Sequence, residues 1–307
     1  MSDLARCIRE LDSLGALTLA PPAEGHTAER HLALMQLGRA DLSSARLAEA
    51  HTDALAILAE SRRSSGTAGI YGVWASDGPQ GRLTATRREE GGWSISGTKE
   101  YCSGATLVDA ALVTAHSEDG ILLFDVPLDT PGVAALPSTW ASPAFSDTAT
   151  GPVSFADTSL PDSALVGSAG WYLSRAGFWH GAIGPSACWA GGALSLIDAA
   201  ARLNRKDPHS RAQVGALQAI AWGFEAILVK VGAEIDLDPA GSDRARVRAL
   251  KVRHLIERWC TEVMDRFGQA TGPQLLAHDP RTVRQHAALA LYLRQCHGAR
   301  DLENIPP

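Results

Sequence analysis

The spacing of apolar residues divides the chain into three regions. Up to residue 68, leucines such as Leu32, Leu47 and Leu58 recur at roughly helical intervals with charged residues between them. From residue 69 to 166 the period changes to two, and from residue 167 to 307 it is helical again. The pattern therefore predicts an α+β multi-domain protein, with N-terminal helices at 1–68, a central β domain at 69–166 and a C-terminal helical bundle at 167–307.

Short alternating segments indicate that the central region is a β domain. They are separated by Asp-Gly, Gly-Gly and Pro-Gly turns, and no helix-length segment interrupts them. We expect an antiparallel barrel or sandwich. The predicted strands are Arg82–Arg87, Trp93–Gly97, Ala110–Ala115, Ile121–Val126 and Pro152–Phe155.

The C-terminal region contains long apolar-faced segments that are typical of an up-and-down four-helix bundle. They are separated by loops at Asn204–Pro208, Asp236–Ser242 and Gly272–Pro280. The stretch Ala176–Ile197 carries no formal charge and is long enough to span a membrane. Because no basic cluster flanks it, we expect a buried helix and no membrane partner. In the N-terminal region, Asp41-Leu-Ser-Ser predicts the start of another helix.

Composition narrows the class of protein. The 307 residues are 45% apolar, which is enough for sizeable cores, and 34 acidic against 28 basic residues give a net charge of -6. No block of lysines or arginines is long enough to follow a phosphate backbone, so we expect no nucleic-acid partner. Five cysteines without a C-x-x-C pair and histidines without H-x-x-x-H spacing predict neither disulfides nor a metal site. Charged residues interrupt the first dozen positions, where a secretory signal needs an apolar core, so we expect a cytoplasmic protein.

Several motifs, in sequence order, resemble the acyl-CoA dehydrogenase superfamily of flavoproteins. The central motif is Gly92-Trp-Ser-Ile-Ser-Gly-Thr-Lys-Glu-Tyr-Cys-Ser-Gly-Ala105, which is similar to the family's strand and turn beside the flavin ring. The other matching segments are Leu37–Leu42, Gly120–Pro127, Thr130–Val133, Val153–Asp157 and Val166–Gly170. The resemblance covers most of the chain, with an N-terminal helical domain that is shorter than the family's.

The resemblance implies an FAD-dependent oxidoreductase that acts on an acyl thioester or a related carrier-bound acyl substrate. It also implies a homodimer or homotetramer, because the family completes each flavin site with a neighbouring subunit. The positions implied for cofactor binding are Trp74, Ser76, Tyr101 and Ser103 around the flavin ring, and Arg211 and Gln269 near the pyrophosphate or adenine.

The family's catalytic glutamate, which removes the proton α to the thioester, is missing. Its usual position corresponds to Ala290-Leu-Tyr-Leu-Arg294 and its alternative position to Leu173-Ser-Arg-Ala176, and neither segment contains an acid. His180, in Phe178-Trp-His-Gly181, is our candidate for the general base. The alternative is a buried histidine bonded to the backbone. A second candidate group comprises Arg284, His286, Tyr292 and His297.

Two other functions stay open at this point. Flavin-dependent monooxygenases of the same superfamily also lack the glutamate, and their reduced flavin reacts with oxygen. A non-catalytic relative without flavin would bind an acyl group or a protein partner. Cys102 lies between residues expected to face the flavin, and we interpret it as a small buried hydrophobic residue.

Overall fold

A computed structural model describes residues 2–66, 69–79 and 81–306. The chain forms two compact units. Unit 1 comprises the residues up to Pro21 and Ala50–Phe178, and unit 2 comprises Pro22–Glu49 and the residues from Trp179 onward. The N-terminal helices are therefore shared between the two units. Residues 67–68, where the first predicted boundary falls, lie outside the described residues.

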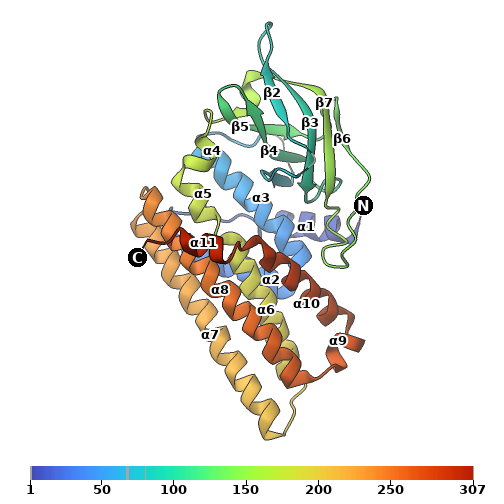
Figure 1. Cartoon of the computed structure of the whole chain (residues 1–307), viewed down its shortest axis with the longest axis vertical. Helices are drawn as coiled ribbons and strands as arrows, with labels where there is room; N and C mark the ends of the chain where they lie inside the picture. Colours follow the sequence, from blue (N-terminus) through green and yellow to red (C-terminus); the bar gives the residue numbers. More distant parts are fainter. Residues whose placement is uncertain (1, 67–68, 80, 307) are drawn as a thin grey trace. The chain divides into compact units, whose positions relative to one another are not determined.

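Unit 1 contains one β-sheet (Figure 1), with most of its strands in the order β6-β7-β3-β2-β4-β5-β8. The strands are β1 (Tyr71–Trp74), β2 (Thr84–Arg87), β3 (Trp93–Cys102), β4 (Ala110–Ser117), β5 (Gly120–Pro127), β6 (Val133–Ala135), β7 (Gly151–Leu160) and β8 (Leu165–Val166). All five predicted strands are present. Sequence reasoning missed β1, β6 and β8, which have two to four residues and lack the alternating flanks that extend the pattern around β2.

The sheet is mixed, whereas the alternating pattern predicts an antiparallel one. β1 pairs in parallel with β4, in a register that places Tyr71 opposite Ala110 and Trp74 opposite Val113. The other neighbouring pairs are antiparallel except for a single parallel pairing of β2 with β4. Local alternation cannot predict the direction of pairing, because both kinds of strand share the period of two.

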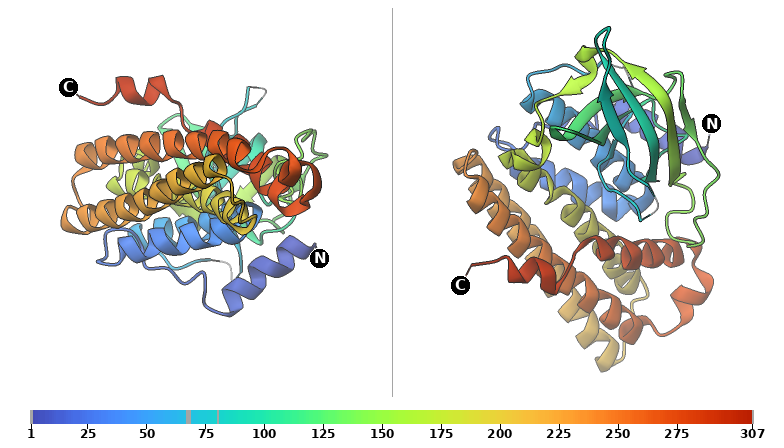
Figure 2. Two further views of the ribbon diagram at one scale, coloured as in Figure 1. Left: turned by 90° about the horizontal axis from the view of Figure 1, so that it is seen from below. Right: turned by 45° about the horizontal axis from the view of Figure 1, so that its top comes forward.

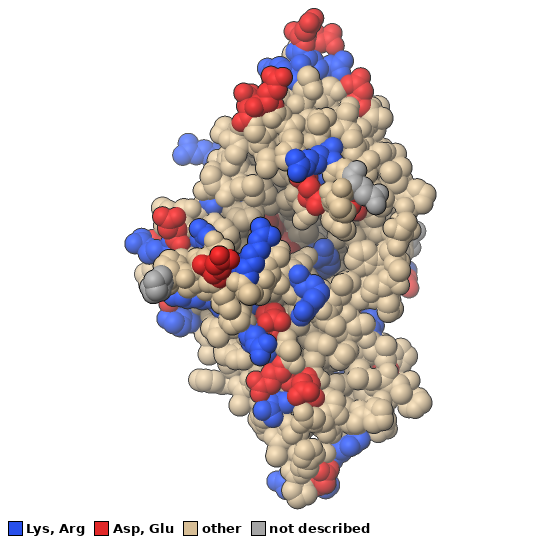
Figure 3. Space-filling view, in the orientation of Figure 1, with Lys and Arg blue, Asp and Glu red and all other residues tan. Residues whose placement is uncertain are grey.

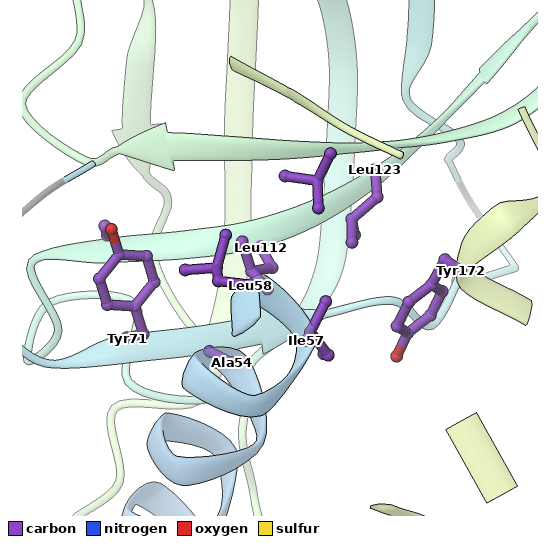
Figure 4. Packing of buried hydrophobic residues seen from close by; sticks show 9 residues of the cluster. Ala54, Ile57, Leu58, Tyr71, Leu112, Leu123 and Tyr172 are labelled. Atoms are coloured by element: carbon purple, nitrogen blue, oxygen red, sulfur yellow. The ribbon is translucent and has the colours of Figure 1, made fainter. Parts of the chain in front are cut away.

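The core of unit 1 lies where the C-terminal half of α3 (Leu42–Glu60) packs on the sheet. Figure 4 shows Ala54, Ile57 and Leu58 of this helix facing Tyr71 and Leu112 of the strands. Apolar residues spaced three and four apart lie on one side of a helix, so this stripe covers the sheet. The remaining short elements of this unit are α1 (Asp3–Ser13), η1 (Asp162–Ala164) and α4 (Trp171–Ser174).

Unit 2 is a helical bundle. Its main helices are α2 (Thr27–Ala40), α6 (Gly184–Arg202), α7 (Pro208–Leu237), α8 (Ser242–Thr271) and α10 (Pro280–Tyr292). The loops between the last four match the breaks that the sequence predicts. Shorter elements are α5 (Ala176–Gly181), which begins in unit 1, and α9 (Gln274–His278), η2 (Leu293–Gln295) and α11 (Ala299–Glu303).

Side-chain caps fix where the helices begin. Asp207 precedes α7 and accepts a hydrogen bond from the backbone N–H of Ser210 at 2.8 Å. Asp41 accepts one from the N–H of Ser44 at 2.9 Å, as the motif before α3 predicts. Each carboxylate satisfies an N–H that has no partner within the helix.

The uncharged stretch Ala176–Ile197 forms two helices, α5 and most of α6, where one was expected, and α6 is largely buried as predicted. It approaches α2 closely, because a Cβ at Gly191 would overlap the carbonyl oxygen of Met35. Among the described residues one helix, α7, is long and apolar enough to cross a membrane, and 22% of its most apolar window is buried. On the face that Figure 3 draws, basic and acidic side chains are intermixed.

Candidate functional site

The ends of β1 and β3 bring two of the predicted flavin-site residues together in unit 1. Trp74 is buried, and its indole Nε1–H donates to the carbonyl oxygen of Ser103 at 3.0 Å. The Ser103 hydroxyl accepts a hydrogen bond of 3.2 Å from the hydroxyl of Thr150. The indole of Trp74 therefore fixes the turn after β3.

An irregularity in β3 turns Tyr101 outward. Strict alternation from the buried Lys99 would place Tyr101 inside and Cys102 outside, but the pairing with β7 shifts register between Lys99 and Cys102. Tyr101 is consequently 50% exposed. Cys102 is fully buried, as expected, and burial raises the pKa of its thiol to about 12.

A buried lysine holds the turn that carries Ser76. Lys99 is only 1% exposed, and its ammonium donates to Asp77 Oδ1 at 2.7 Å and to Thr114 Oγ1 at 2.8 Å. It also lies 3.1 Å from the carbonyl oxygen of Thr114 and 3.4 Å from that of Ala75. Ser76 lies between two of these anchored residues and is exposed.

Asp77 has a second hydrogen-bond partner. His116 Nε2 lies 2.7 Å from Asp77 Oδ2. Burial alone would raise the pKa of Asp77, but the hydrogen bonds from Lys99 and His116 outweigh it and lower that pKa below its ordinary value. Sequence reasoning missed this network. The available signal was a lysine two residues beyond a predicted strand, in phase with the inward-facing Trp93 and Ile95, because a buried cation requires a partner.

Arg211 and Gln269 lie in unit 2, at the end where α7 begins and α8 finishes. Arg211 is exposed in the first turn of α7. The amide of Gln269 donates to Asp265 at 2.9 Å and accepts from the amide of Gln213 at 2.9 Å. A Cβ at Gly268 would meet no atom within 4 Å. This end of unit 2 therefore offers an exposed guanidinium, bonded amide groups and free space beside Gly268.

His180 is buried in unit 2, and its Nε2 lies 3.1 Å from the carbonyl oxygen of Pro239. Another buried histidine of this unit, His31, lies 3.2 Å from the carbonyl oxygen of Leu228 through Nδ1. Burial lowers the pKa of His31 to about 4. A bond to a backbone carbonyl suits a structural histidine, and the role of His180 as a base stays a prediction.

The residues of the second group of catalytic candidates each contact a different partner. Arg284 pairs with Asp41, and His297 Nδ1 lies 3.3 Å from Asp301. Tyr292 is buried beneath the guanidinium of Arg46, which lies 5.1 Å from the ring centroid. Among the described residues, no group of three or more His, Cys, Asp or Glu side chains could hold a metal ion.

The chemical groups that the two units expose are of the types that bind a flavin. Unit 1 presents exposed Ser76 on the turn that Lys99 holds in place, and exposed Tyr101 at the end of β3, just before the turn that Trp74 holds. Hydroxyls of this kind suit the polar edge of a flavin ring. Unit 2 presents the guanidinium of Arg211 in the first turn of α7, a group that suits a phosphate.

Comparison with solved structures shows the fold. FMN-bound TdsC from Paenibacillus sp. A11-2, a dibenzothiophene monooxygenase, matches with a TM-score of 0.80 at 19% identity over 99% of this chain and 94% of its own. Glutaryl-CoA dehydrogenase from Mycobacterium smegmatis matches with a TM-score of 0.82 at 18% identity over 99% and 86%. KijD3, solved with FMN and a dTDP-linked sugar, gives 0.78 at 18% identity over 98% and 86%.

The chain therefore has the acyl-CoA dehydrogenase fold, which confirms the fold that the ordered motifs indicate. A scan of known protein families and a search of curated proteins find no match to the sequence.

Proposed function

We propose that this chain is a flavin-dependent oxidoreductase. The observation that carries the proposal is the neighbourhood of two anchored turns in unit 1, where Lys99 and Trp74 hold the backbone, Ser76 is exposed on one turn and Tyr101 is exposed at the end of β3, just before the other. A bound flavin supplies two-electron redox chemistry, which the protein's own side chains lack. FAD is the cofactor that the family resemblance implies, and the FMN in TdsC and KijD3 makes FMN the alternative.

The arrangement of the chain's own groups favours oxygen-dependent chemistry over α,β-dehydrogenation of an acyl thioester. Dehydrogenation needs a base beside the acidic C–H of the substrate. Neither Ala290–Arg294 nor Leu173–Ala176 supplies a carboxylate, and His180, the remaining candidate base, is buried against the carbonyl of Pro239. A monooxygenase does not require a base at that position, and the dibenzothiophene monooxygenase TdsC has this fold.

The first test is the visible absorption spectrum of the purified protein, before and after incubation with FAD and, separately, FMN. We expect the two flavin bands to persist through gel filtration with one of the cofactors. Ser76→Ala and Tyr101→Phe each remove one hydroxyl, and the loss of about 1 kcal/mol of hydrogen bonding weakens flavin binding about fivefold. Ser13→Ala, an exposed serine on α1, is the matched control.

Two kinetic readouts separate the alternatives. Rapid reoxidation of the reduced protein by oxygen supports a monooxygenase, whereas anaerobic bleaching by acyl-CoA supports a dehydrogenase. If bleaching occurs and His180→Ala abolishes it while flavin stays bound, His180 is the base. A protein that stays colourless with excess FAD and FMN refutes both enzymatic functions and favours the non-catalytic relative.

A further inference from the structure

Two side chains hold the start of β1 in unit 1. Asp109 Oδ2 accepts a hydrogen bond from the backbone N–H of Ile70 at 2.7 Å, and His51 Nδ1 accepts one from the N–H of Tyr71 at 3.1 Å. Among the described residues β1 pairs with β4 alone, so the N–H groups on its other edge need acceptors from outside the sheet. His51, on α3, supplies the acceptor for Tyr71.

The helix α1 contacts both of these acceptors. Figure 2 shows α1 as the dark blue helix next to the N-terminus. Arg9 Nη1 and Nη2 donate to the two carboxylate oxygens of Asp109 at 2.8 and 2.9 Å. Asp12 Oδ1 lies 3.6 Å from His51 Nε2. The helix therefore helps to orient both side chains that hold β1.

The contacts of His51 define its protonation state. A ring nitrogen that accepts from an N–H carries no proton, so the proton of neutral His51 is on Nε2, which faces Asp12. His51 is 3% exposed. Burial lowers the pKa of His51, and the carboxylates of Asp12 and Asp109 oppose this effect only in part. His51 is therefore neutral at pH 7.

Protonation of His51 is incompatible with its bond to β1. The second proton has to enter at Nδ1, the atom that accepts from Tyr71. Two N–H donors would then face each other, and the hydrogen bond would be lost. The charged groups that bear on the ring are Asp12 of α1 and Asp109, which precedes β4 and pairs with Arg9. They attract the protonated ring toward the side of α1 and offer nothing to the Tyr71 N–H.

We propose that His51 is a positioning residue for β1 and for the turn that follows it, and that it acts in its neutral form. The strand has four residues and spans roughly 13 Å, so a shift at Tyr71 is passed along it to Trp74. Trp74 bonds to the turn after β3, and exposed Ser76 lies two residues beyond Trp74. Acid should therefore weaken flavin binding, a consequence that rests on the proposed function.

The first test measures how well β1 is held, and it uses two variants of His51. His51→Leu keeps a similar shape and removes the acceptor, whereas His51→Asn keeps an oxygen at the same place along the side chain as Nδ1 and does not titrate. Amide hydrogen exchange at neutral pH should be about tenfold faster at Tyr71 in His51→Leu than in the wild type. His51→Asn should restore most of the protection. Circular dichroism checks that each variant is folded.

The second test measures the dissociation constant of the flavin that the wild type retains, at pH 7 and at about pH 5. We expect His51→Leu to bind flavin about tenfold more weakly than the wild type at pH 7. The wild type should lose affinity in acid, and His51→Asn should lose less. The matched control is His31→Leu, because His31 is 1% exposed and also bonds to the backbone through Nδ1, but lies in unit 2. It should leave flavin affinity unchanged.

The outcomes separate a positioning role from general destabilisation. Equal exchange at Tyr71 in the wild type and His51→Leu refutes the proposal, as does an equal loss of affinity in acid for the wild type and His51→Asn. The role is also wrong if His31→Leu weakens flavin binding as much as His51→Leu does. If His51→Leu does not fold, the comparison of the wild type with His51→Asn across pH decides the question.

Hydrogen exchange requires no flavin, so the two proposals can fail separately. A protein that binds neither FAD nor FMN refutes the proposed function. The exchange rate at Tyr71 in that case still decides whether His51 holds β1.

Discussion

Replacement of Lys99 by methionine tests the network that holds the turn at Ser76. Methionine keeps the apolar stem of the lysine but removes the ammonium, so the carbonyl oxygens of Ala75 and Thr114 lose their charged donor. Breaking a buried ion pair costs about 3–5 kcal/mol. The Asp77 side chain is 31% exposed and regains water, so we expect the lower end of this range, about 3 kcal/mol.

Urea denaturation followed by tryptophan fluorescence measures this cost. Lys206→Met is the matched control, because Lys206 is exposed and bonded only locally to Asn204, and it should change the free energy of unfolding by less than about 0.5 kcal/mol. Asp77→Asn leaves the Lys99 ammonium buried without its carboxylate and should also destabilise. The double variant should lose less stability than the sum of the losses in the two single variants, because both substitutions break the same interaction.

The pH dependence gives a second readout. The pKa of Asp77 in the folded protein lies below the ordinary value of 3.8, so its contribution to stability is complete above that value and is lost as the pH falls through the folded pKa. The difference between wild type and Lys99→Met should therefore shrink in acid. A cost below about 1 kcal/mol at neutral pH, or costs that add fully in the double variant, would refute the role of Lys99 as the anchor of this turn.

Two further predictions concern unit 2. The pKa of His31 falls from 6.5 to about 4 on folding. As the pH falls, the unfolded chain therefore binds a proton at His31 before the folded chain does. The free energy of unfolding should decrease by about 3 kcal/mol between pH 6.5 and pH 4. Urea titrations across this range should show a smaller decrease for His31→Gln; an equal decrease would assign the effect to other groups. Gly191→Ala inserts a methyl group between α6 and α2 and should destabilise by about 1–3 kcal/mol, whereas Gly268→Ala, with open space around its Cβ, should stabilise by about 0.5–1 kcal/mol. Thermal melts that rank these two variants in the opposite order would contradict the close helix contact.

The sequence predicts much of the fold because local patterns determine it. The period of two in Ala110–Ala115 and the helical period after the break at Asn204–Pro208 both correspond to elements of the structure. Asp41 marks the start of α3 because its carboxylate caps the helix within four residues. Ordered motifs such as Gly92–Ala105 resemble one superfamily, and the structural comparison confirms that fold.

Tertiary structure decides the features that depend on distant residues. A register shift between β3 and β7 turns Tyr101 outward and buries Cys102. Local alternation alone would predict the opposite. The partners of Lys99 come from a turn 22 residues earlier and from a strand 15 residues later, so their meeting requires the folded sheet.

The same distinction applies to α7. Sequence alone determines that the helix is long and apolar along much of its length. Which face is buried depends on α2, α6 and α8, because hydrophobicity drives burial without specifying a partner. Only the packed bundle shows that Trp222 stays exposed while Phe224, two residues later, is buried.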